Sequence, residues 1–477
     1  MRDRLVLLAA ACAAFGASLG SGFHFDDYAI FSDPALTSPG GWLRLWGLRQ
    51  TRPLTYFTYW LNYQAGGTNP LGYHALNLAL HLAAVLLAFE CLRRWLPART
   101  AGLAAVIFAV HPIQAESVDY VWGRSIVLAS VLCFGALLAW MSGRTWLAVA
   151  CFAAALAAKE ECSAFPLVLG LLWWTQRPRR RPWPIAAMLA LSLAAGLRVV
   201  YAAAVTPGAQ AGTRAGIAPA EYALAQGVAI LRYLRLLVVP WGFSIDPDLR
   251  VPPVWLGALA WVAILSLAVL AWRRRAAWGL WMLAGFVLLL PSSSVFPAAD
   301  LAADRRMYLP LVAFAAAAAI LLSRFRSTAV PVLIAGILLV GSVCRTQVWR
   351  SDQALWREAL ERAPGKVRPR IQLARAVPPP EALQLLEEAR RIAPRDPAIA
   401  TEAGRTLLAA GNPAAALGQF GRALALDPRD AANYSNRGVV LAALGQTEAA
   451  RRDFQRALEI SPGLTSAAEN LRKMEGR

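Results

Sequence analysis

A succession of apolar segments from Leu5 to Cys344 constrains the fold of this chain more than any other feature. The sequence is 57% hydrophobic and only 16% charged, whereas soluble globular proteins carry about 25% charged residues. Because a helix needs roughly 20 apolar residues to cross a bilayer, we expect about eleven membrane spans. The candidate segments are residues 5–21, 74–92, 101–113, 125–141, 145–158, 162–175, 183–204, 254–272, 277–291, 308–323 and 328–345.

The basic clusters predict how these spans are oriented. If about eleven spans start in the cytoplasm, every cluster falls on the inner side, as the positive-inside rule requires. The clusters are Arg2/Arg4, Arg93/Arg94, Arg144, Arg177/Arg179/Arg180/Arg181, Arg273/Arg274/Arg275 and Arg324/Arg326. Segment 221–240, interrupted by Arg232 and Arg235, must then lie at the outer face without crossing. The net charge of +19 therefore reflects membrane topology, and we expect no nucleic-acid partner.

An acidic pair, Asp26-Asp27, follows the first apolar segment and is framed by aromatic residues. A carboxylate near hydrocarbon is costly and marks a candidate functional site. On these residues alone, a solvated turn remains an alternative. The predicted orientation brings further charged and polar residues to the same outer side: Arg52, His111, Glu116, Arg124, Lys159, Glu160, Asp304, Arg305 and Arg306.

Each of these residues also has a structural alternative. Arg52 could snorkel to the interface, His111 could end a helix, and Lys159-Glu160 could simply stop two short spans. The adjacent Arg305 and Arg306, however, oppose the positive-inside trend, and a phosphate on an external ligand would explain them better. The six cysteines lie in or beside apolar segments without CxxC spacing, so we expect neither a disulfide framework nor a metal site from them.

After Cys344 the composition becomes polar and the sequence repeats every 34 residues. The pairs Gly404/Gly438 and Phe420/Phe454 share this offset, which with its Ala and Pro positions is the tetratricopeptide pattern of paired helices. We expect two regular repeats, a truncated one, a half-unit and a capping helix at 464–474. The predicted fold class is all-α: a polytopic membrane bundle at 1–345, followed by a short α-solenoid at 346–477 that binds a protein or peptide partner.

Several short motifs occur in one order along the chain: Phe25-Asp26-Asp27, Arg52-Pro53-Leu54-Thr55, Gly72-Tyr73-His74, His111-Pro112 with Glu116 and Arg124, Lys159-Glu160, and Arg306-Tyr308-Leu309-Pro310. Together they resemble the type C glycosyltransferases, which take a sugar from a polyprenyl-phosphate carrier. More closely, the chain resembles the family of protein O-mannosyltransferases that joins such a membrane part to tetratricopeptide repeats. The chain departs from that family at Asp304-Arg305, where Glu and His usually precede the arginine.

The resemblance implies a glycosyltransferase that moves a mannose-like sugar to a hydroxyl acceptor, such as protein Ser or Thr, with inversion. By motif position Asp26 would be the general base, with Asp27 orienting the acceptor or sharing the charge. The cations Arg124, Lys159, Arg305, Arg306 and Arg52 would bind the donor phosphate. Supporting roles would fall to His111, Glu116, Glu160 and Asp304. No cofactor is required, although Mg²⁺ or Mn²⁺ on Asp26 and Asp27 remains an alternative.

We expect this protein in a bacterial inner membrane, with its site and repeats on the extracytoplasmic side. A non-catalytic scaffold, in which the repeats assemble a complex and the spans act as an anchor, is the alternative from another class. A simple anchor needs neither so many spans nor charges converging on one face. A transporter is a third option, but its sites should lie near the middle of the membrane.

Overall fold

The fold is taken from a computed structural model, which describes residues 1–176, 181–206, 212, 216–273, 277–293, 295–325, 327–474 and 476. Six arginines of the predicted basic clusters lie outside these residues: Arg177, Arg179, Arg180, Arg274, Arg275 and Arg326. The chain divides into two compact units, Met1–Ser351 and Asp352–Arg477. The last helix of the first unit continues to Val348, so this division falls a few residues after the predicted boundary.

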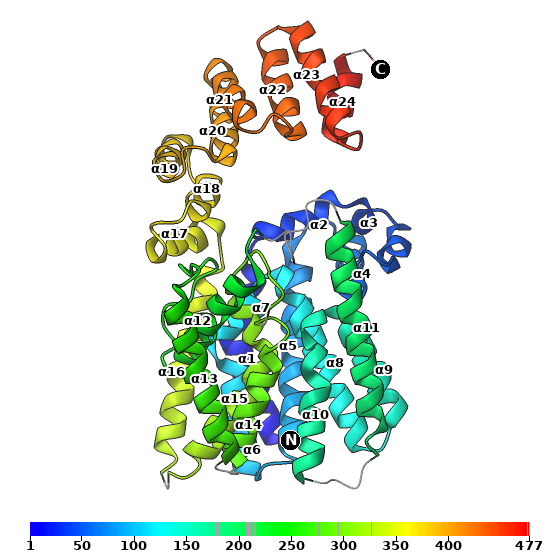
Figure 1. The fold of residues 1–477 in the computed structure, drawn as a ribbon, viewed down its shortest axis with the longest axis vertical. Coiled ribbons are helices and arrows are strands. Elements are labelled where there is room, and N and C mark those ends of the chain that lie inside the picture. Colours follow the sequence, from blue (N-terminus) through cyan, green and yellow to red (C-terminus); the bar gives the residue numbers. More distant parts are fainter. Residues whose placement is uncertain are drawn as a thin grey trace. The chain divides into compact units, whose positions relative to one another are not determined.

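The first unit is a bundle of apolar helices (Figure 1). Its longer helices are α1 (Arg2–Phe15), α4 (Pro53–Gly66), α5 (Pro70–Leu92), α6 (Ala98–Val110), α8 (Arg124–Met141), α9 (Thr145–Ala158), α10 (Phe165–Gln176), α11 (Trp183–Val205), α12 (Pro219–Val238), α13 (Val254–Arg273), α14 (Ala277–Leu289), α15 (Tyr308–Leu322) and α16 (Ala329–Val348). Short elements connect them: η1 (Gly16–Gly20), η2 (Phe25–Tyr28), α2 (Ala29–Ser32), α3 (Pro34–Thr37), η3 (Gly41–Trp46), η4 (Pro112–Gln114), α7 (Ala115–Val118), η5 (Val121–Gly123), η6 (Glu160–Ala164) and η8 (Asp304–Met307).

All eleven predicted spans are helical, but fewer of them are long enough to cross a membrane alone. Within the described residues, seven helical stretches are long and apolar enough to cross a membrane. The number is eight if the bent pair Ala98–Val110 and Pro112–Val118 counts as one span. Helices α9, α10 and α14 have only 14, 12 and 13 residues. At about 1.5 Å per residue they reach roughly 20 Å, less than the bilayer core. Length and composition alone therefore support seven or eight spans, and the predicted count of about eleven holds only as an approximation.

The two ends of this bundle differ in composition. Arg4 of α1 pairs with Glu90 near the end of α5 at 2.6 Å, so the first basic cluster and Arg93/Arg94 share one end. Helices α2 and α3 lie at the opposite end from the N-terminus (Figure 1). Helix α12 contains Glu221, Arg232 and Arg235 and is not among the membrane-spanning candidates. The first basic cluster and the short helices that follow the acidic turn therefore lie at opposite ends of the bundle.

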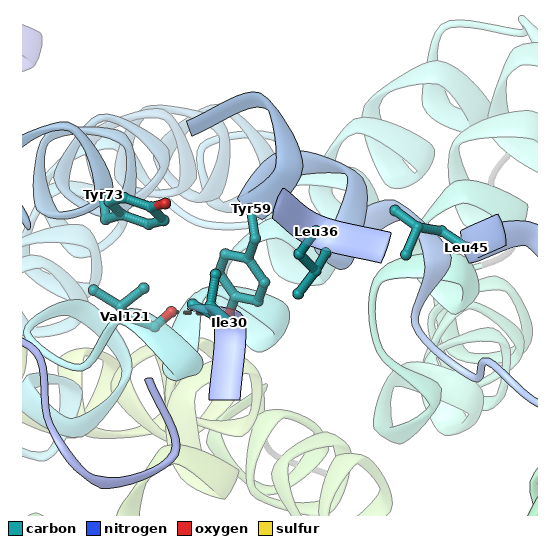
Figure 2. Packing of buried hydrophobic residues seen from close by; sticks show 6 residues of the cluster. All are labelled: Ile30, Leu36, Leu45, Tyr59, Tyr73 and Val121. Atoms are coloured by element: carbon teal, nitrogen blue, oxygen red, sulfur yellow. Dashed lines mark hydrogen bonds between the residues drawn. The ribbon is translucent and has the colours of Figure 1, made fainter. Parts of the chain in front are cut away.

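A small apolar core supports the connection that carries the acidic pair. Ile30, Leu36 and Leu45 from α2, α3 and η3 are buried with Tyr59, Tyr73 and Val121 (Figure 2). The Tyr59 hydroxyl donates a hydrogen bond to the Val121 carbonyl at 3.0 Å, which joins α4 to η5. Burial of an aromatic or aliphatic side chain contributes about 1.5–3 kcal/mol, so this core holds the connection against α4, α5 and η5.

The second unit consists of sequential helix pairs. Its helices are α17 (Asp352–Arg362), α18 (Arg368–Ala374), α19 (Pro379–Ile392), α20 (Pro397–Ala409), α21 (Pro413–Leu426), α22 (Ala431–Ala443), α23 (Thr447–Ile460) and α24 (Thr465–Met474). A Cβ at Gly404 would lie 2.9 Å from the Phe420 ring, and one at Gly438 would lie 2.7 Å from the Phe454 ring. The glycine and phenylalanine of each repeat therefore pack together, as the pattern predicted.

Candidate functional site

The acidic pair lies in a tight 3₁₀ turn, η2, whose backbone is held from several sides. Phe25 adopts φ 41°, the left-handed region that is unfavourable for a residue other than glycine. The Asp26 backbone N–H donates to the Tyr120 hydroxyl at 3.1 Å. Strained backbone persists only where neighbouring contacts fix it, and such strain often accompanies function.

The two carboxylates have different environments. Asp27 is fully buried, and its two oxygens accept backbone N–H groups of His24 at 2.9 Å and Trp122 at 2.8 Å. Burial raises the pKa of Asp27 to about 7, although these two hydrogen bonds and the neighbouring His24 oppose the shift. Asp26 remains partly exposed. Both Asp27 oxygens thus bind backbone N–H groups of the protein, so Asp27 ties the acidic turn to η5.

Aromatic residues surround this turn. The Trp122 ring stacks on Tyr59 with centroids 5.8 Å apart, and Tyr56 meets Trp122 edge-on at the same separation. Gly123 allows η5 to approach closely, since a Cβ there would lie 2.6 Å from the Glu116 carbonyl oxygen. Tyr120 and Trp122 were not predicted as site residues. Their only signal in the sequence was two aromatic residues, separated by Val121, just before Gly123 and Arg124.

A second part of the site lies at the end of α9. Arg52 makes a two-pronged ion pair with Glu160, at 2.9 Å from Nε and 2.5 Å from Nη2. Burial by itself raises the pKa of Glu160, but Arg52 and Lys159 together lower it to about 2. Lys159 is only 3% exposed, and its Nζ lies 3.4 Å from Glu161. Burial lowers the pKa of Lys159 to about 8, with Glu161 partly offsetting this effect.

The third part is η8, which carries Asp304, Arg305 and Arg306. Arg305 pairs with Glu116 through side chain and backbone and also lies 3.4 Å from Asp300. Asp304 accepts from Arg232 of α12 at 2.6 Å. Arg306 is 7% exposed and donates to the carbonyls of Leu301 and Asp300 at 3.2 and 2.7 Å. The predicted supporting carboxylates Glu116 and Glu160 are thus the ion-pair partners of the predicted cations Arg305 and Arg52.

Two further predicted residues, Arg124 and His111, are buried and bind protein groups that carry no charge. Arg124 is fully buried and donates to Asn77 at 2.7 Å, Thr58 at 3.1 Å and the Tyr73 carbonyl at 3.0 Å. These neutral partners occupy the guanidinium, so the geometry favours a positioning role for Arg124 over phosphate binding. His111 is 1% exposed; its Nδ1 accepts the Ile113 N–H at 3.1 Å, so it caps η4, which is its structural alternative.

Electrostatic interactions connect the three parts. The charges of Arg52, Glu160 and Arg305 influence the pKa of Lys159, and the charge of Arg306 influences the pKa of Glu161. On the other side, Tyr56 interacts with Arg52, Glu160 and Asp26. Tyr120 interacts with Asp26, Asp27 and Arg305. The structure therefore gathers the acidic turn and four predicted cations, Arg52, Lys159, Arg305 and Arg306, into one cluster.

The part of the cluster that follows α9 is recessed relative to α11 because α9 is short. Trp146 and Trp183, in the first turns of α9 and α11, have ring centroids 4.8 Å apart, so both helices begin at one level. Helix α11 has 23 residues and α9 has 14, which at about 1.5 Å per residue leaves the end of α9 some 14 Å short. Glu160 accordingly shares a cavity of about 230 Å³ with Arg198, a residue within α11. A recessed site excludes water better than a site at the membrane surface.

An apolar cavity of about 320 Å³ lies between α6, α12, α13, α14 and α15. His111, Leu234 and Leu311 line it near one end, and Leu270 and Leu321 near the other. Leu270 and Leu321 are 44% and 38% exposed, so the cavity opens toward the apolar flank of the bundle. In the part of the chain that the structure describes, no group of three or more His, Cys, Asp or Glu side chains is arranged to hold a metal ion.

Comparisons with known proteins give a consistent picture. A tetratricopeptide-repeat family model matches residues 401–465. Protein O-mannosyl-transferase F38B6.6 of Caenorhabditis elegans is 24% identical over 76% of this chain and 58% of its own length. Protein O-mannosyl-transferase Tmtc1 of Drosophila melanogaster is 42% identical over 25% of this chain and 15% of its own length. The chain thus spans little more than half of the first relative and a smaller part of the second.

Among solved structures, ArnT from Cupriavidus metallidurans bound to undecaprenyl phosphate aligns with 90% of this chain and 80% of its own. The identity is 16% and the TM-score 0.43, a similarity that bears on neither substrate nor mechanism. The chain is a helical integral-membrane protein that carries tetratricopeptide repeats and is related in sequence to the protein O-mannosyl-transferases.

Proposed function

We propose that this protein is an integral-membrane glycosyltransferase, which moves a mannose-like sugar from a polyprenyl-phosphate carrier to a hydroxyl of a protein acceptor. The observation that carries the proposal is the cluster in which a partly exposed carboxylate, Asp26, shares one site with Arg52, Lys159, Arg305 and Arg306. The sequence relation to protein O-mannosyl-transferases supports the reaction class.

Asp26 is the general base in this proposal. Its carboxylate takes the proton of the acceptor hydroxyl while the hydroxyl oxygen bonds to the anomeric carbon. The bond between that carbon and the phosphate oxygen breaks, and its electron pair leaves with the lipid phosphate. The product then has the opposite anomeric configuration to the donor. Asp27 supports this role by binding the backbone of His24, before the turn, and of Trp122 in η5.

Lys159 is the cation best suited to receive the departing phosphate. Its only ion-pair contact in the described structure is Glu161 at 3.4 Å, whereas Arg52 and Arg305 each hold a carboxylate closely. An ammonium has three donors, so Lys159 retains capacity for phosphate oxygens. Positive charge placed where the leaving group develops negative charge stabilises the transition state. One such donor typically raises the reaction rate by roughly 100-fold or more. Arg306 adds a second positive charge, which interacts electrostatically with Glu161.

The apolar cavity between α12, α13 and α15 suits the polyprenyl chain of the donor. Its lining is aliphatic and aromatic, and its open flank would admit a lipid chain from the bilayer. We place the site and the repeats on the extracytoplasmic side of a bacterial inner membrane, because the first basic clusters lie at the opposite end of the bundle. The repeats would hold the acceptor protein or a partner.

The test is transfer of label from a polyprenyl-phosphate mannose to a Ser/Thr peptide by the full-length protein in vesicles. We expect an O-linked product whose anomeric configuration, read by NMR, is inverted relative to the donor. A retained configuration would contradict direct displacement with Asp26 as base. If the intact donor is never consumed with any acceptor, the non-catalytic scaffold is the better description.

Sidedness has a separate test. A reporter fused after Arg345 should be extracytoplasmic, and a cytoplasmic signal there would contradict the proposed orientation.

A further inference from the structure

The acidic turn is tied to the last helix of the membrane unit, far away in sequence. Nε2 of His24 lies 2.6 Å from the backbone carbonyl oxygen of Trp349, the residue that follows α16. Because a carbonyl oxygen only accepts, Nε2 must be the protonated nitrogen of this ring. His24 and Trp349 are both fully buried, so the bond is shielded from water. A buried bond of this kind fixes both backbones more strongly than an exposed one.

Trp349 reaches the turn by a second route. Its ring lies 5.5 Å from the Tyr120 ring and 5.8 Å from the His24 ring, between centroids. Tyr120 accepts the N–H of Asp26, and His24 donates its own N–H to Asp27. One tryptophan therefore packs against two of the three residues that hold the acidic pair, the third being Trp122. Thr346, one turn earlier in α16, donates to Asp119 at 2.9 Å and so fixes the residue before Tyr120.

We propose that Trp349 is a positioning residue for Asp26, acting through His24 and Tyr120, so that the end of α16 and the acidic turn behave as one body. This inference rests on the proposed function for its catalytic consequence. Phe25 is strained, and a strained turn keeps its shape only while its neighbours hold it. Trp349 is also separated by only two residues from Asp352, where the second unit begins. The connection to the repeats therefore starts at the same residue that supports the turn.

The experiment compares three variants of the full-length protein in detergent or vesicles: Trp349→Ala, Trp349→Phe and Trp140→Ala. Trp140 is the matched control, because it is a fully buried tryptophan near the end of α8 that hydrogen-bonds the Arg181 carbonyl. The first readout is hydrogen–deuterium exchange of residues 23–30, which needs no activity. We expect about a tenfold faster exchange in Trp349→Ala, little change in Trp349→Phe, and none in Trp140→Ala.

The second readout is sugar transfer, normalised to folded protein. We expect Trp349→Ala to lower kcat by about 10- to 100-fold with the donor KM little changed, because misplacing the base affects the chemical step more than donor binding. Trp349→Phe should recover most of the rate. His24→Ala should also lower the rate, and the double variant should lose less than the two single losses combined, since the two residues share one contact while Trp349 also packs on Tyr120.

The outcomes separate the two proposals. Unchanged exchange at residues 23–30 in Trp349→Ala would overturn the positioning role, as would an equal effect in Trp140→Ala. Exchange that rises as predicted while the wild type transfers no sugar would support the positioning contact and contradict the proposed function. Additive losses in the double variant would show that Trp349 does not act through His24.

Discussion

The buried ammonium of Lys159 makes the pH dependence of transfer a sharp prediction. Burial lowers its pKa to about 8, so the free enzyme loses this positive charge as pH rises through that value. If Lys159 receives the phosphate, kcat/KM should fall about tenfold for each pH unit above 8. Arginine stays protonated to beyond pH 12, roughly, so Lys159→Arg should move this alkaline limb out of the measured range.

The expected loss of kcat/KM in the Lys159 variants follows from the same geometry. Lys159→Gln removes the charge at every pH, and we expect kcat/KM at neutral pH to fall by about 100-fold with no alkaline limb near 8. Lys159→Arg should lose less of its kcat/KM, because arginine keeps the positive charge, although its planar guanidinium fits this position less well than an ammonium. On the acid side, Asp27 must be ionised to accept both backbone N–H groups fully, and its pKa of about 7 predicts a falling rate below that pH.

The assay is initial-rate transfer at low donor concentration between about pH 5.5 and 10, with vesicles equilibrated at each pH. Lys473→Arg, in the last helix of the repeat unit, serves as the control and should keep the wild-type profile. An alkaline limb that persists near pH 8 in Lys159→Arg would refute the assignment of that limb to Lys159. A Lys159→Gln rate equal to the wild type would refute its role altogether.

Other predictions test the packing and the cations. Gly438→Ala places a Cβ 2.7 Å from the Phe454 ring and should destabilise the repeat unit by about 1–3 kcal/mol, whereas Gly418→Ala has open space and should stabilise it slightly; thermal unfolding that ranks them oppositely would contradict this packing. Gly123→Ala places a Cβ 2.6 Å from the Glu116 carbonyl oxygen and should lower transfer through the displaced Trp122–Asp27 bond, while Gly102→Ala, with nothing near, should not; equal rates would argue against it. EDTA should leave transfer unchanged, because Asp27 is buried with both oxygens on backbone N–H groups, which leaves a single exposed carboxylate for a hard cation; loss of activity restored by Mg²⁺ or Mn²⁺ would instead assign the acidic pair to metal binding.

The sequence predicted local structure well because local structure follows from periodic patterns. Each apolar segment is a helix, and the 34-residue repeat is a series of helix pairs in which Gly404 and Gly438 face Phe420 and Phe454. Apolar length, however, does not say how deep a helix lies. The 14-residue α9 and the 23-residue α11 start at one level, and only that tertiary fact shows that Lys159 is recessed.

The roles of individual charges were harder to predict, because partners come from distant segments. Asp26 and Asp27 are adjacent in sequence and equivalent in pattern, but backbone groups of His24 and Trp122 bind Asp27 alone. Arg124 and Lys159 were both predicted as cations on the outer side, yet each nitrogen of the Arg124 guanidinium donates to a neutral group on α4 or α5. The contact between His24 and Trp349 joins residues 325 positions apart, and no local motif signals it.

In the proposed mechanism, Asp26 removes the proton of the acceptor hydroxyl. The most direct measurement of this role is single-turnover transfer from labelled polyprenyl-phosphate mannose by Asp26→Asn, beside Asp33→Asn as a control in the same connection. Asp33 caps α3 by accepting the Ala35 N–H at 2.8 Å, a role that asparagine can also fill. We expect Asp26→Asn to bind the donor normally and transfer at least about 100-fold more slowly, with Asp33→Asn unchanged. Transfer by Asp26→Asn at the wild-type rate would show that another group is the base.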